Sequence, residues 1–473
     1  MDHITIDRLE KYIRTGDLDT VYGFRSMTWA QMTSVLREVE QKGRLSPVDQ
    51  WMLTDYGIEK NGWQLYSYMQ VGGIVSRSNP ARLLETDAWM NPLVNAQQGG
   101  RFVAGGHILN IEPRLVLENA KWFSLDLWPQ IRMTDDQTWD LDMFQAVLKV
   151  GVHNLELAAG QMHFKWGQGR HASMLFAGSQ KPLQMIRLQN VEPTLLPGWF
   201  SFLGKGKFTL FFARMDDDQA LPGSLLVGER IAFRVSPVFE FGLTQMIQVG
   251  GQGYPDVPWY ENVSEVLGYR FNANETNFTN RNAMFDFRFR IPQWNNLNLY
   301  GEVFLEDCCN INFDKNIGNM LGIELPEVGR NRATTIGFEH IRTTFVYNRH
   351  FRYRSGFIYE GISLGHHIGA DALGFYGFIM QDFANGFSHE FLGALEVRQV
   401  HDYSSRKNDI RTIVADYEVR ERRLRGAYQV KLHFSKQWTA SIQWGLEYIQ
   451  GFDFALGNNK IFAAGRYQLE YSF

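Results

Sequence analysis

The sequence has little cysteine: only Cys308 and Cys309 occur among 473 residues, and they are neighbours. Adjacent cysteines rarely bridge each other because the ring is strained, and no C-x-x-C spacing lies nearby. The sequence therefore predicts neither a disulfide framework nor a zinc site. A vicinal thiol pair that binds a soft metal is the alternative interpretation of these two residues.

Long apolar runs and an excess of one charge sign are also missing. No stretch approaches the roughly 18 apolar residues that a transmembrane helix needs, and the mean hydropathy is −0.28. This excludes a helical membrane protein. The net charge of −4 and the pI of about 6.3 give no reason to expect nucleic acid as a partner. No signal peptide opens the chain, so we expect a mature form whose export signal is absent from this chain.

Aromatic residues and glycine are abundant, with 35 Phe, 19 Tyr, 13 Trp and 44 Gly. The chain ends on "RYQLEYSF", an alternating stretch whose apolar side chains share one face of an extended strand. That face consists of Tyr467, Leu469, Tyr471 and Phe473. A closing strand of a soluble sandwich is one interpretation. A membrane barrel is the other, and in that case this face is an assembly signal that an insertion machine pairs with by strand addition.

The same alternation recurs along the chain. In "AMFDFRFRI", Phe285, Phe287 and Phe289 share one face, and Asp286 and Arg288 share the other. The segments 297–306, 424–434 and 438–448 behave alike. Several polar faces carry both signs of charge, which suits a wet, hydrogen-bonded lumen better than the outside of a sandwich.

Connections between these segments alternate in length from the middle of the chain onwards. The short links are 235–238, 292–296, 341–343, 383–386 and 435–437, and the long ones are 216–225, 252–280, 308–333, 352–370 and 401–419. Short turns on one side and long loops on the other are typical of an outer-membrane barrel. Twelve strands after residue 205 and six before it predict an all-β membrane barrel of about 18 antiparallel strands, with both ends of the barrel on the periplasmic side.

The first 60 residues have a different pattern. Residues 5–16 and 27–43 show apolar side chains at helical spacing, and 46–57 begins with a serine and a proline typical of a helix start. We expect a small α-helical bundle over 1–60 at the periplasmic mouth, followed by the barrel over 61–473. A targeting peptide is the alternative, but acidic residues and helix stops argue against it.

Four segments resemble the Wzi capsule-assembly family of Gram-negative outer-membrane proteins: "AGQMHFKWGQG", "FEFGLTQMIQVGGQGYPD", "LYGEVFLED" and "SLGHHIGADALGFYG". They occur in the family's order over essentially the whole chain. Lys165 and Gln168 depart from the family, which has a second tryptophan and a proline at these places. The resemblance implies an 18-stranded barrel with a helical start, loops that occlude the lumen, and a non-catalytic, lectin-like role in holding capsular or exopolysaccharide.

Sugars are bound by aromatic faces and by polar side chains that reach their hydroxyls, so we place the glycan site in the long loops. The candidate glycan-binding residues are Trp166, Arg170, His171, Tyr254, Asp256, Trp259, Tyr260, His366, His367 and Asp371. The structural alternative for each is that it only fills the barrel. The remaining expected partners are outer-membrane lipid and the barrel-insertion machinery, and we expect a monomer without cofactors.

Three other functions were weighed. A metal at His366, His367 and Asp371 is disfavoured because adjacent histidines are expected to point apart. An enzyme built on His171, Ser173 and Ser179 is disfavoured because no G-x-S-x-G motif is present. An open porin or solute-specific channel is the stronger alternative, and the bulky segments "VPWYENV", "GFIYEGI" and "NMLGIEL" are expected to fill its lumen instead.

Overall fold

The computed structural model describes residues 3–18, 20–21, 36–44, 62–77, 81–82, 89–90, 105–119, 122–254, 258–266, 279–306, 317–329, 333–344, 346–348, 350, 352–383, 386–398, 419–435 and 437–473. Cys308, Cys309 and Asp256 lie outside these residues. Within this part of the chain, no helix combines the length and the apolarity needed to cross a membrane.

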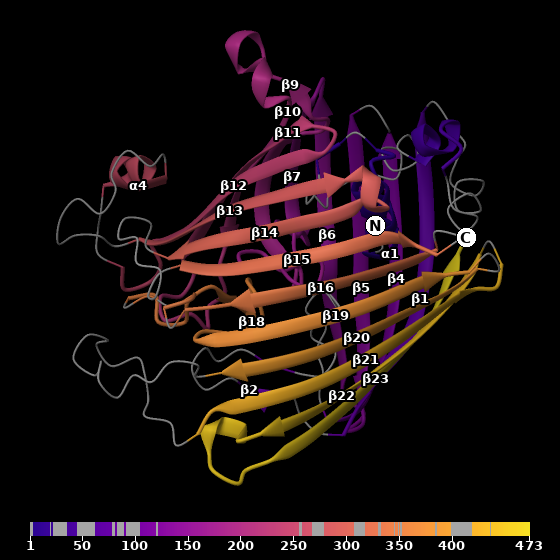
Figure 1. Ribbon diagram of the computed structural model, residues 1–473. Coiled ribbons are helices and arrows are strands. Elements are labelled where there is room, and N and C mark those ends of the chain that lie inside the picture. Colours follow the sequence, from indigo (N-terminus) through magenta and orange to yellow (C-terminus); the bar gives the residue numbers. More distant parts are fainter. Residues whose placement is uncertain are drawn as a thin grey trace.

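One antiparallel sheet dominates the fold and closes into a barrel (Figure 1). In the described part of the chain it has 19 strands, of which the two-residue β9 is a short addition, so 18 strands form the wall. The wall strands are β1 (Trp63–Ser76), β4 (Gly106–Asn119), β5 (Phe123–Thr134), β6 (Trp139–Val152), β7 (Leu155–Met162), β8 (Leu183–Asn190), β10 (Lys205–Arg214), β11 (Leu225–Ser236), β12 (Phe239–Val249), β13 (Asn280–Ile291), β14 (Leu297–Glu306), β15 (Ile317–Val328), β16 (Thr334–Arg342), β19 (Ala372–Asp382), β20 (Phe387–Arg398), β21 (Glu421–His433), β22 (Trp438–Gln450) and β23 (Lys460–Ser472).

Closure comes from β1, which pairs with β4 on one side and with β23 on the other. Val71 lies opposite Ile111 in the first pair and opposite Leu469 in the second. Each wall strand has two antiparallel neighbours, so every strand edge is paired. The expected barrel of 18 antiparallel strands is therefore confirmed.

Short elements decorate the wall. They are α1 (His3–Thr15), β2 (Ala81–Arg82), β3 (Trp89–Met90), β9 (Thr194–Leu195), η2 (Gly198–Leu203), α4 (Trp259–Val266), η3 (Pro292–Trp294), β17 (Ile358–Tyr359), β18 (Ile362–Ser363) and η4 (Phe452–Phe454). We call the end of the barrel that carries the chain's C-terminus and the tight turns after β11, β13, β15, β19 and β21 the short-turn end. The opposite end is the long-loop end, and Figure 1 shows α4 there, far from the C-terminus.

The sequence pattern missed one wall strand and instead counted the stretch between the expected links 341–343 and 352–370, whose described residues form no strand, so the total stayed correct. The expected long loop 308–333 contains β15, and the expected short link 341–343 begins inside β16. "NMLGIEL" therefore belongs to the wall and does not fill the lumen. Gly322 helps to explain the error, because a Cβ there would lie 2.2 Å from the Tyr300 ring. The close approach of that ring requires glycine, and glycine weakens the strand pattern.

The two faces of the wall reverse the usual arrangement of a soluble protein. On β13, Phe285 and Phe289 are exposed while Asp286 and Arg288 are buried, as the alternation predicted. Exposed tryptophans and phenylalanines gather near the short-turn end, at positions such as Trp63, Trp122, Trp294, Phe434 and Phe473. An apolar outer surface with an aromatic belt and a polar interior is the pattern of a barrel whose solvent is lipid.

Helix α1 lies on the lumen side of the wall (Figure 1). Its apolar face, with Leu9, Tyr12 and Ile13, packs against Tyr68 of β1 and Val116 of β4. The last carbonyls of a helix have no partner within the helix, so they need donors from elsewhere.

Two wall side chains supply those donors. Asn298 donates to the Arg14 carbonyl at 3.1 Å and Arg290 donates to the Thr15 carbonyl at 2.9 Å. The Arg290 cation also complements the negative end of the helix dipole. Of the other predicted helices, residues 36–41 are helical, while 46–57 lies outside the described residues.

A buried ion pair joins α1 to the wall, with 2.7 Å between Arg14 Nε and Glu324 Oε1. Replacing Arg14 by Met leaves the Glu324 carboxylate buried without its cation, so we expect a loss of about 3–5 kcal/mol of stability. The temperature at which the folded barrel loses its compact migration in SDS gels measures this loss. The double variant Arg14→Met, Glu324→Leu should recover most of it, because an apolar pair of similar volume removes the uncompensated charge.

Lys11 provides the matched control on the same helix. Its ion pair with Asp382 spans 3.5 Å and is partly exposed, so Lys11→Met should cost less than about 1 kcal/mol. An equal loss in both single variants would contradict the special role of the Arg14–Glu324 pair.

Candidate functional site

Two chain segments at the long-loop end fold into the lumen, residues 163–182 after β7 and the described residues of 343–371 after β16. We call them together the plug. Their buried side chains form one apolar cluster with residues from twelve wall strands, β6 to β8, β10 to β16, β19 and β20. The plug therefore packs against two thirds of the 18 wall strands.

Aromatic rings form the part of the plug nearest to β10. Trp166 is 2% exposed, and its ring centroid lies 5.1 Å from those of Phe164 and Phe211. Phe164 stacks on Phe176 at 4.3 Å. Trp166 is thus a packing residue of the plug in this structure.

One of the wall carboxylates that bind the first plug segment is Glu302 of β14. Its Oε1 accepts from the backbone N–H groups of Gln168 at 2.7 Å and Gly169 at 2.9 Å. Its Oε2 accepts from the Ser173 hydroxyl at 3.0 Å and from the Met174 N–H at 2.7 Å. These bonds satisfy loop backbone groups that would otherwise be buried without partners.

Glycine is required at the turn of this segment. Gly167 has φ +103°, and a Cβ there would lie 2.4 Å from Glu302 Oε1. Only a residue without a side chain lets the backbone approach the carboxylate so closely. Gly167 therefore lies directly against a protein carboxylate.

Glu339 of β16 binds the next residues of the plug. It accepts from the N–H groups of Arg170 and His171, the latter at 2.9 Å, and from the Tyr300 hydroxyl at 2.7 Å. The Arg170 guanidinium lies over the Phe378 ring, 4.9 Å from its centroid. Arg170 is therefore buried against the wall and away from the long-loop surface.

Gln168 occupies the centre of a polar network in the lumen. Its amide nitrogen donates to Asp286 at 2.8 Å, and its amide oxygen accepts from Arg288 at 2.8 Å. Arg230 in turn forms a buried ion pair with Asp286 at 2.5 Å. The Gln168 amide nitrogen also lies 3.3 Å from a Glu240 oxygen of β12, so the glutamine that replaces the proline of the resembling family binds both β12 and β13.

Three of the predicted site residues, His171, His366 and His367, converge in the plug. They are 3%, 1% and 5% exposed, and one ring nitrogen of each lies within 4.8 Å of the others. The rings of His366 and His367 stack at 4.4 Å, so the expectation that adjacent histidines point apart is wrong. The loop backbone between β18 and β19 is not extended there, and the alternation of a strand does not apply.

Burial sets the charge of these imidazoles. Desolvation lowers the pKa of all three, and for His171 and His366 well below the ordinary value, with the neighbouring His367 adding to the shift. For His367, the Glu396 carboxylate opposes part of the decrease in pKa. The three imidazoles are therefore neutral near pH 7.

The remaining predicted residues are dispersed. Asp371 is buried at the end of the plug, where its N–H donates to the Thr344 carbonyl at 2.9 Å. Tyr254 lies near Tyr353 with 6.3 Å between ring centroids. Tyr260, on α4, is 57% exposed at the long-loop end, and Trp259 begins the same helix. Of the candidates with described side chains, Tyr260 is the one most available to a large ligand.

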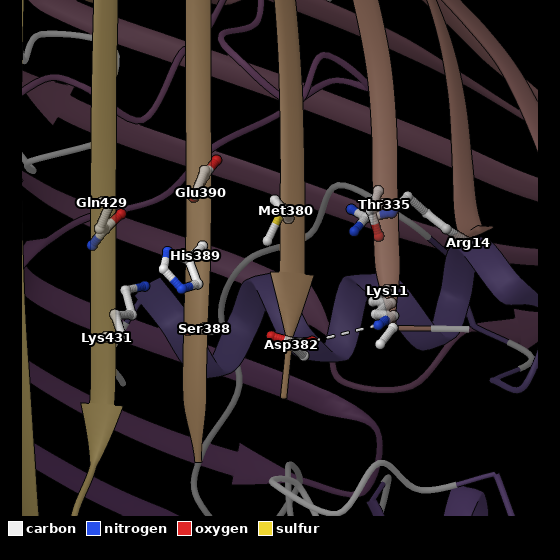
Figure 2. Close-up of a pocket in the computed structure, with 11 residues that line it drawn as sticks. Lys11, Arg14, Thr335, Met380, Asp382, Ser388, His389, Glu390, Gln429 and Lys431 are labelled. Atoms are coloured by element: carbon white, nitrogen blue, oxygen red, sulfur yellow. Dashed lines mark hydrogen bonds and ion pairs between the residues drawn. The ribbon is translucent and has the colours of Figure 1, made fainter. Parts of the chain in front are cut away.

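A polar pocket lies at the other end of the lumen, between α1 and the wall strands β16, β19, β20 and β21 (Figure 2). Lys11, Arg14 and Lys431 face Asp382 and Glu390 across it. Its cavity volume of about 40 Å³ holds a few water molecules and is too small for a sugar ring. Sequence reasoning did not indicate this pocket, because it needs α1 and four strands that lie far apart along the chain.

The family model of capsule assembly protein Wzi matches residues 92–463, most of the chain. The chain belongs to the Wzi family.

Individual relatives agree with this membership. A 55.8 kDa protein in the cps region of Klebsiella pneumoniae is 24% identical over 158 residues, which are 33% of this chain and 31% of that protein. This chain thus spans less than a third of the length of that curated relative. The solved structure of Wzi from Escherichia coli has a TM-score of 0.70 at 15% identity and covers 99% of this chain and 98% of its own. It is described as an outer membrane protein involved in group 1 capsule assembly and as a carbohydrate binding β-barrel.

Pseudomonas aeruginosa OccD3 also shares the fold, with a TM-score of 0.51 at 10% identity over 87% of this chain and 93% of that one. At such identities the similarity shows the barrel architecture alone. The chain belongs to a capsule-assembly family, and its wall has an apolar outer surface suited to lipid. The protein is therefore an outer-membrane barrel. In barrels of this kind the end with short turns faces the periplasm and the end with long loops faces outward.

Sequence reasoning missed the lumen residues that hold the plug of this Wzi-family barrel, namely Glu302, Glu339, Asp286, Arg288 and Gln168. One signal was available, because Glu302 and Asp286 occupy the inward positions of alternating strands. Nothing local to a strand shows, however, which loop its inward carboxylates bind.

We expect the wild-type barrel to show little conductance in a planar bilayer and Glu302→Gln to raise it. The amide offers one acceptor oxygen where the carboxylate offers two, so part of the plug backbone loses its partners. Glu156→Gln is the control, since this buried carboxylate accepts from the wall residues Arg187 and Gln189 and not from the plug in the described part of the chain. Large, stable current steps in the wild type, or equal currents in the two variants, would contradict this account of the plug.

Proposed function

We propose that the protein holds capsular or exopolysaccharide at the cell surface without catalysis, through the outward face of its plugged barrel. The observation that carries this proposal is the plug in the lumen, where wall carboxylates bind plug backbone groups and aromatic rings pack beside them. A plug bound in this way argues against a solute path. Membership of a capsule-assembly family supports a glycan as the partner.

The burial of several predicted site residues reduces the set of residues that a glycan can contact. Four of them lie buried inside the plug, beneath the outward loops: Trp166, His171, His366 and His367. Tyr260 and, by its position on the same short helix, Trp259 belong to the outward loops. We therefore propose α4 as the centre of the glycan-binding face, with Tyr254 and Asp256 on the adjoining stretch of chain.

Catalysis is not part of the proposal. The Ser173 hydroxyl donates to Glu302 at 3.0 Å, and the His171 ring stacks on Tyr376 at 4.1 Å. Within the described residues, these contacts give the serine a carboxylate partner in place of the histidine that a nucleophile needs.

Weak single contacts must be multiplied for such a face to retain a polymer. One aromatic ring stacked on a sugar contributes on the order of 1 kcal/mol. A repeating polysaccharide reaches many protein copies at once, and each further contact is then an intramolecular event with a high effective concentration. Monomeric barrels spread over the membrane would be sufficient for this mode of binding.

Replacing Trp259 and Tyr260 by Ala should release polysaccharide from cells into the medium, because α4 loses the exposed Tyr260 ring and its neighbouring aromatic residue. The amounts of cell-bound and free polysaccharide, measured at equal levels of inserted barrel, give the result. Trp294→Ala with Phe434→Ala is the matched control, since these exposed aromatics lie at the short-turn end, away from α4. Unchanged cell-bound polysaccharide in the α4 variant would refute α4 as the site.

We also propose that the terminal face of Tyr467, Leu469, Tyr471 and Phe473 is recognised by the barrel-insertion machinery. In the closed barrel, β23 is paired on both edges, and the Phe473 N–H donates to the Ser67 carbonyl at 3.1 Å. The edge that joins β1 is free only before closure, when strand addition by another protein is open to it.

Deletion of Phe473 should therefore reduce the amount of protein in the outer membrane. Quantitative blotting of membrane fractions measures this amount. Leu456→Ala is the control, because Leu456 is an exposed apolar residue of the turn before β23 and not part of the signal face. Equal levels in the deletion and in wild type would remove the assembly role from Phe473.

A further inference from the structure

The histidine cluster of the plug joins two segments that are distant in the sequence. His171 comes from the first plug segment, and His366 and His367 come from the second. The centroid of the His171 ring is 5.9 Å from that of His366 and 5.5 Å from that of His367. The three side chains are almost completely buried.

Two ring nitrogens in this cluster have no hydrogen-bond partner in the described structure. They are His171 Nε2 and His367 Nδ1, and both are shielded from solvent. A buried polar atom without a partner costs about 1–3 kcal/mol, so such atoms call for an explanation such as an absent ion.

Glu396 prepares one of these nitrogens to bind a cation. Its Oε1 lies 2.8 Å from His367 Nε2, closer than the Arg425 Nη1 at 3.2 Å, so the shorter contact assigns the ring proton to Nε2 and the lone pair of the neutral ring to Nδ1. The same oxygen accepts from Arg425 at 3.2 Å and from the Tyr376 hydroxyl at 3.0 Å, so the carboxylate is fixed in place. A carboxylate behind a histidine is the usual outer partner of a metal-bound imidazole.

His366 is the adjustable member. Its Nδ1 accepts from the Ile368 N–H at 3.2 Å, a long bond that a metal–nitrogen bond can replace. Zinc binds imidazole nitrogen at about 2.0–2.1 Å, which sets nitrogen–nitrogen separations near 3.3 Å in a tetrahedral site. From separations of up to 4.8 Å, the rings have to approach by about 1.5 Å at most.

The charges around the cluster are balanced. The Arg425 cation binds both Glu396 at 3.2 Å and Glu447 at 2.6 Å, so its charge is compensated by two carboxylates. The Lys165 ammonium donates to the carbonyls of Gly169 and Arg170. A divalent cation among three neutral imidazoles therefore meets no uncompensated positive charge from Arg425.

We propose that His171, His366 and His367 form a binding site for one borderline divalent cation of the zinc class, which cross-links the two plug segments. Imidazole ligands favour Zn²⁺, Co²⁺ and Ni²⁺ over Mg²⁺ and Ca²⁺, which prefer oxygen. Since the ligands belong to both segments, the bound ion stabilises the plug against opening.

Titration of the detergent-purified, chelator-treated barrel with Co²⁺ tests the site directly. We expect one equivalent per chain with the visible ligand-field spectrum of a nitrogen-bound, four- or five-coordinate ion, displaced by Zn²⁺ and not by Mg²⁺. Zinc should also raise the unfolding temperature of the barrel. A wild-type protein that shows neither the spectrum nor the thermal shift overturns the proposal.

Variants locate the ion. His171→Phe keeps the ring that stacks on Tyr376 at 4.1 Å and removes the ligand atom, so affinity should fall at least tenfold. His153→Asn is the control, since this exposed histidine lies in the turn between β6 and β7 with φ +54°, a conformation that asparagine tolerates. Equal affinities in His171→Phe and wild type would mean that the cation binds elsewhere, and the proposal would fail.

Should His171→Phe not insert, X-ray absorption of the zinc-loaded wild type decides the question, because three imidazole ligands are expected and a shell of oxygen atoms would refute the site. Neither result depends on a glycan, so the metal site and the polysaccharide role fail separately.

Discussion

The interior of this barrel depends on the hydrogen bonds that the buried carboxylate of Glu302 accepts from the plug. Loop backbone inside a barrel has no ladder partner, and its N–H groups need acceptors that the wall must supply. Glu302 supplies them at both oxygens, with Gly167 permitting the close approach, and Glu339 does the same for Arg170 and His171. Wall and plug therefore form one hydrogen-bonded structure, and this structure supports the outward loops.

The wall was predictable because its rules are local. Period-two alternation and both signs of charge on the inner face can be recognised within a dozen residues. Together with the alternation of link lengths along the chain, they led to the correct number of strands. The error at β15 has the same origin, since Gly318, Gly322 and Pro326 weaken the alternation there. These residues are tolerated because Tyr300 fills the space beside Gly322 and the neighbouring strands supply the register.

The site was less predictable because its contacts are long-range. Gln168 and Glu302 are 134 residues apart, and His171 and Glu339 are 168 apart. The sequence pattern placed these aromatic and histidine residues in the long loops. It could not show that Trp166 and the three histidines are buried while Tyr260 is exposed. Which rings meet a ligand depends on which backbone groups the wall carboxylates bind, and that information is distributed over the whole chain.

The contacts at the end of α1 determine when this helix can reach its native environment. The carbonyls of Arg14 and Thr15 are bound by Asn298 and Arg290, which follow them by 284 and 275 residues. Helix α1 is thus completed by strands made far later, and until then its last carbonyls stay hydrated. A polar, hydrated helical segment is suited to transit through the periplasm, whereas the outer face of the wall is not. The end of α1 therefore reaches its native contacts only after β13 and β14 have been made.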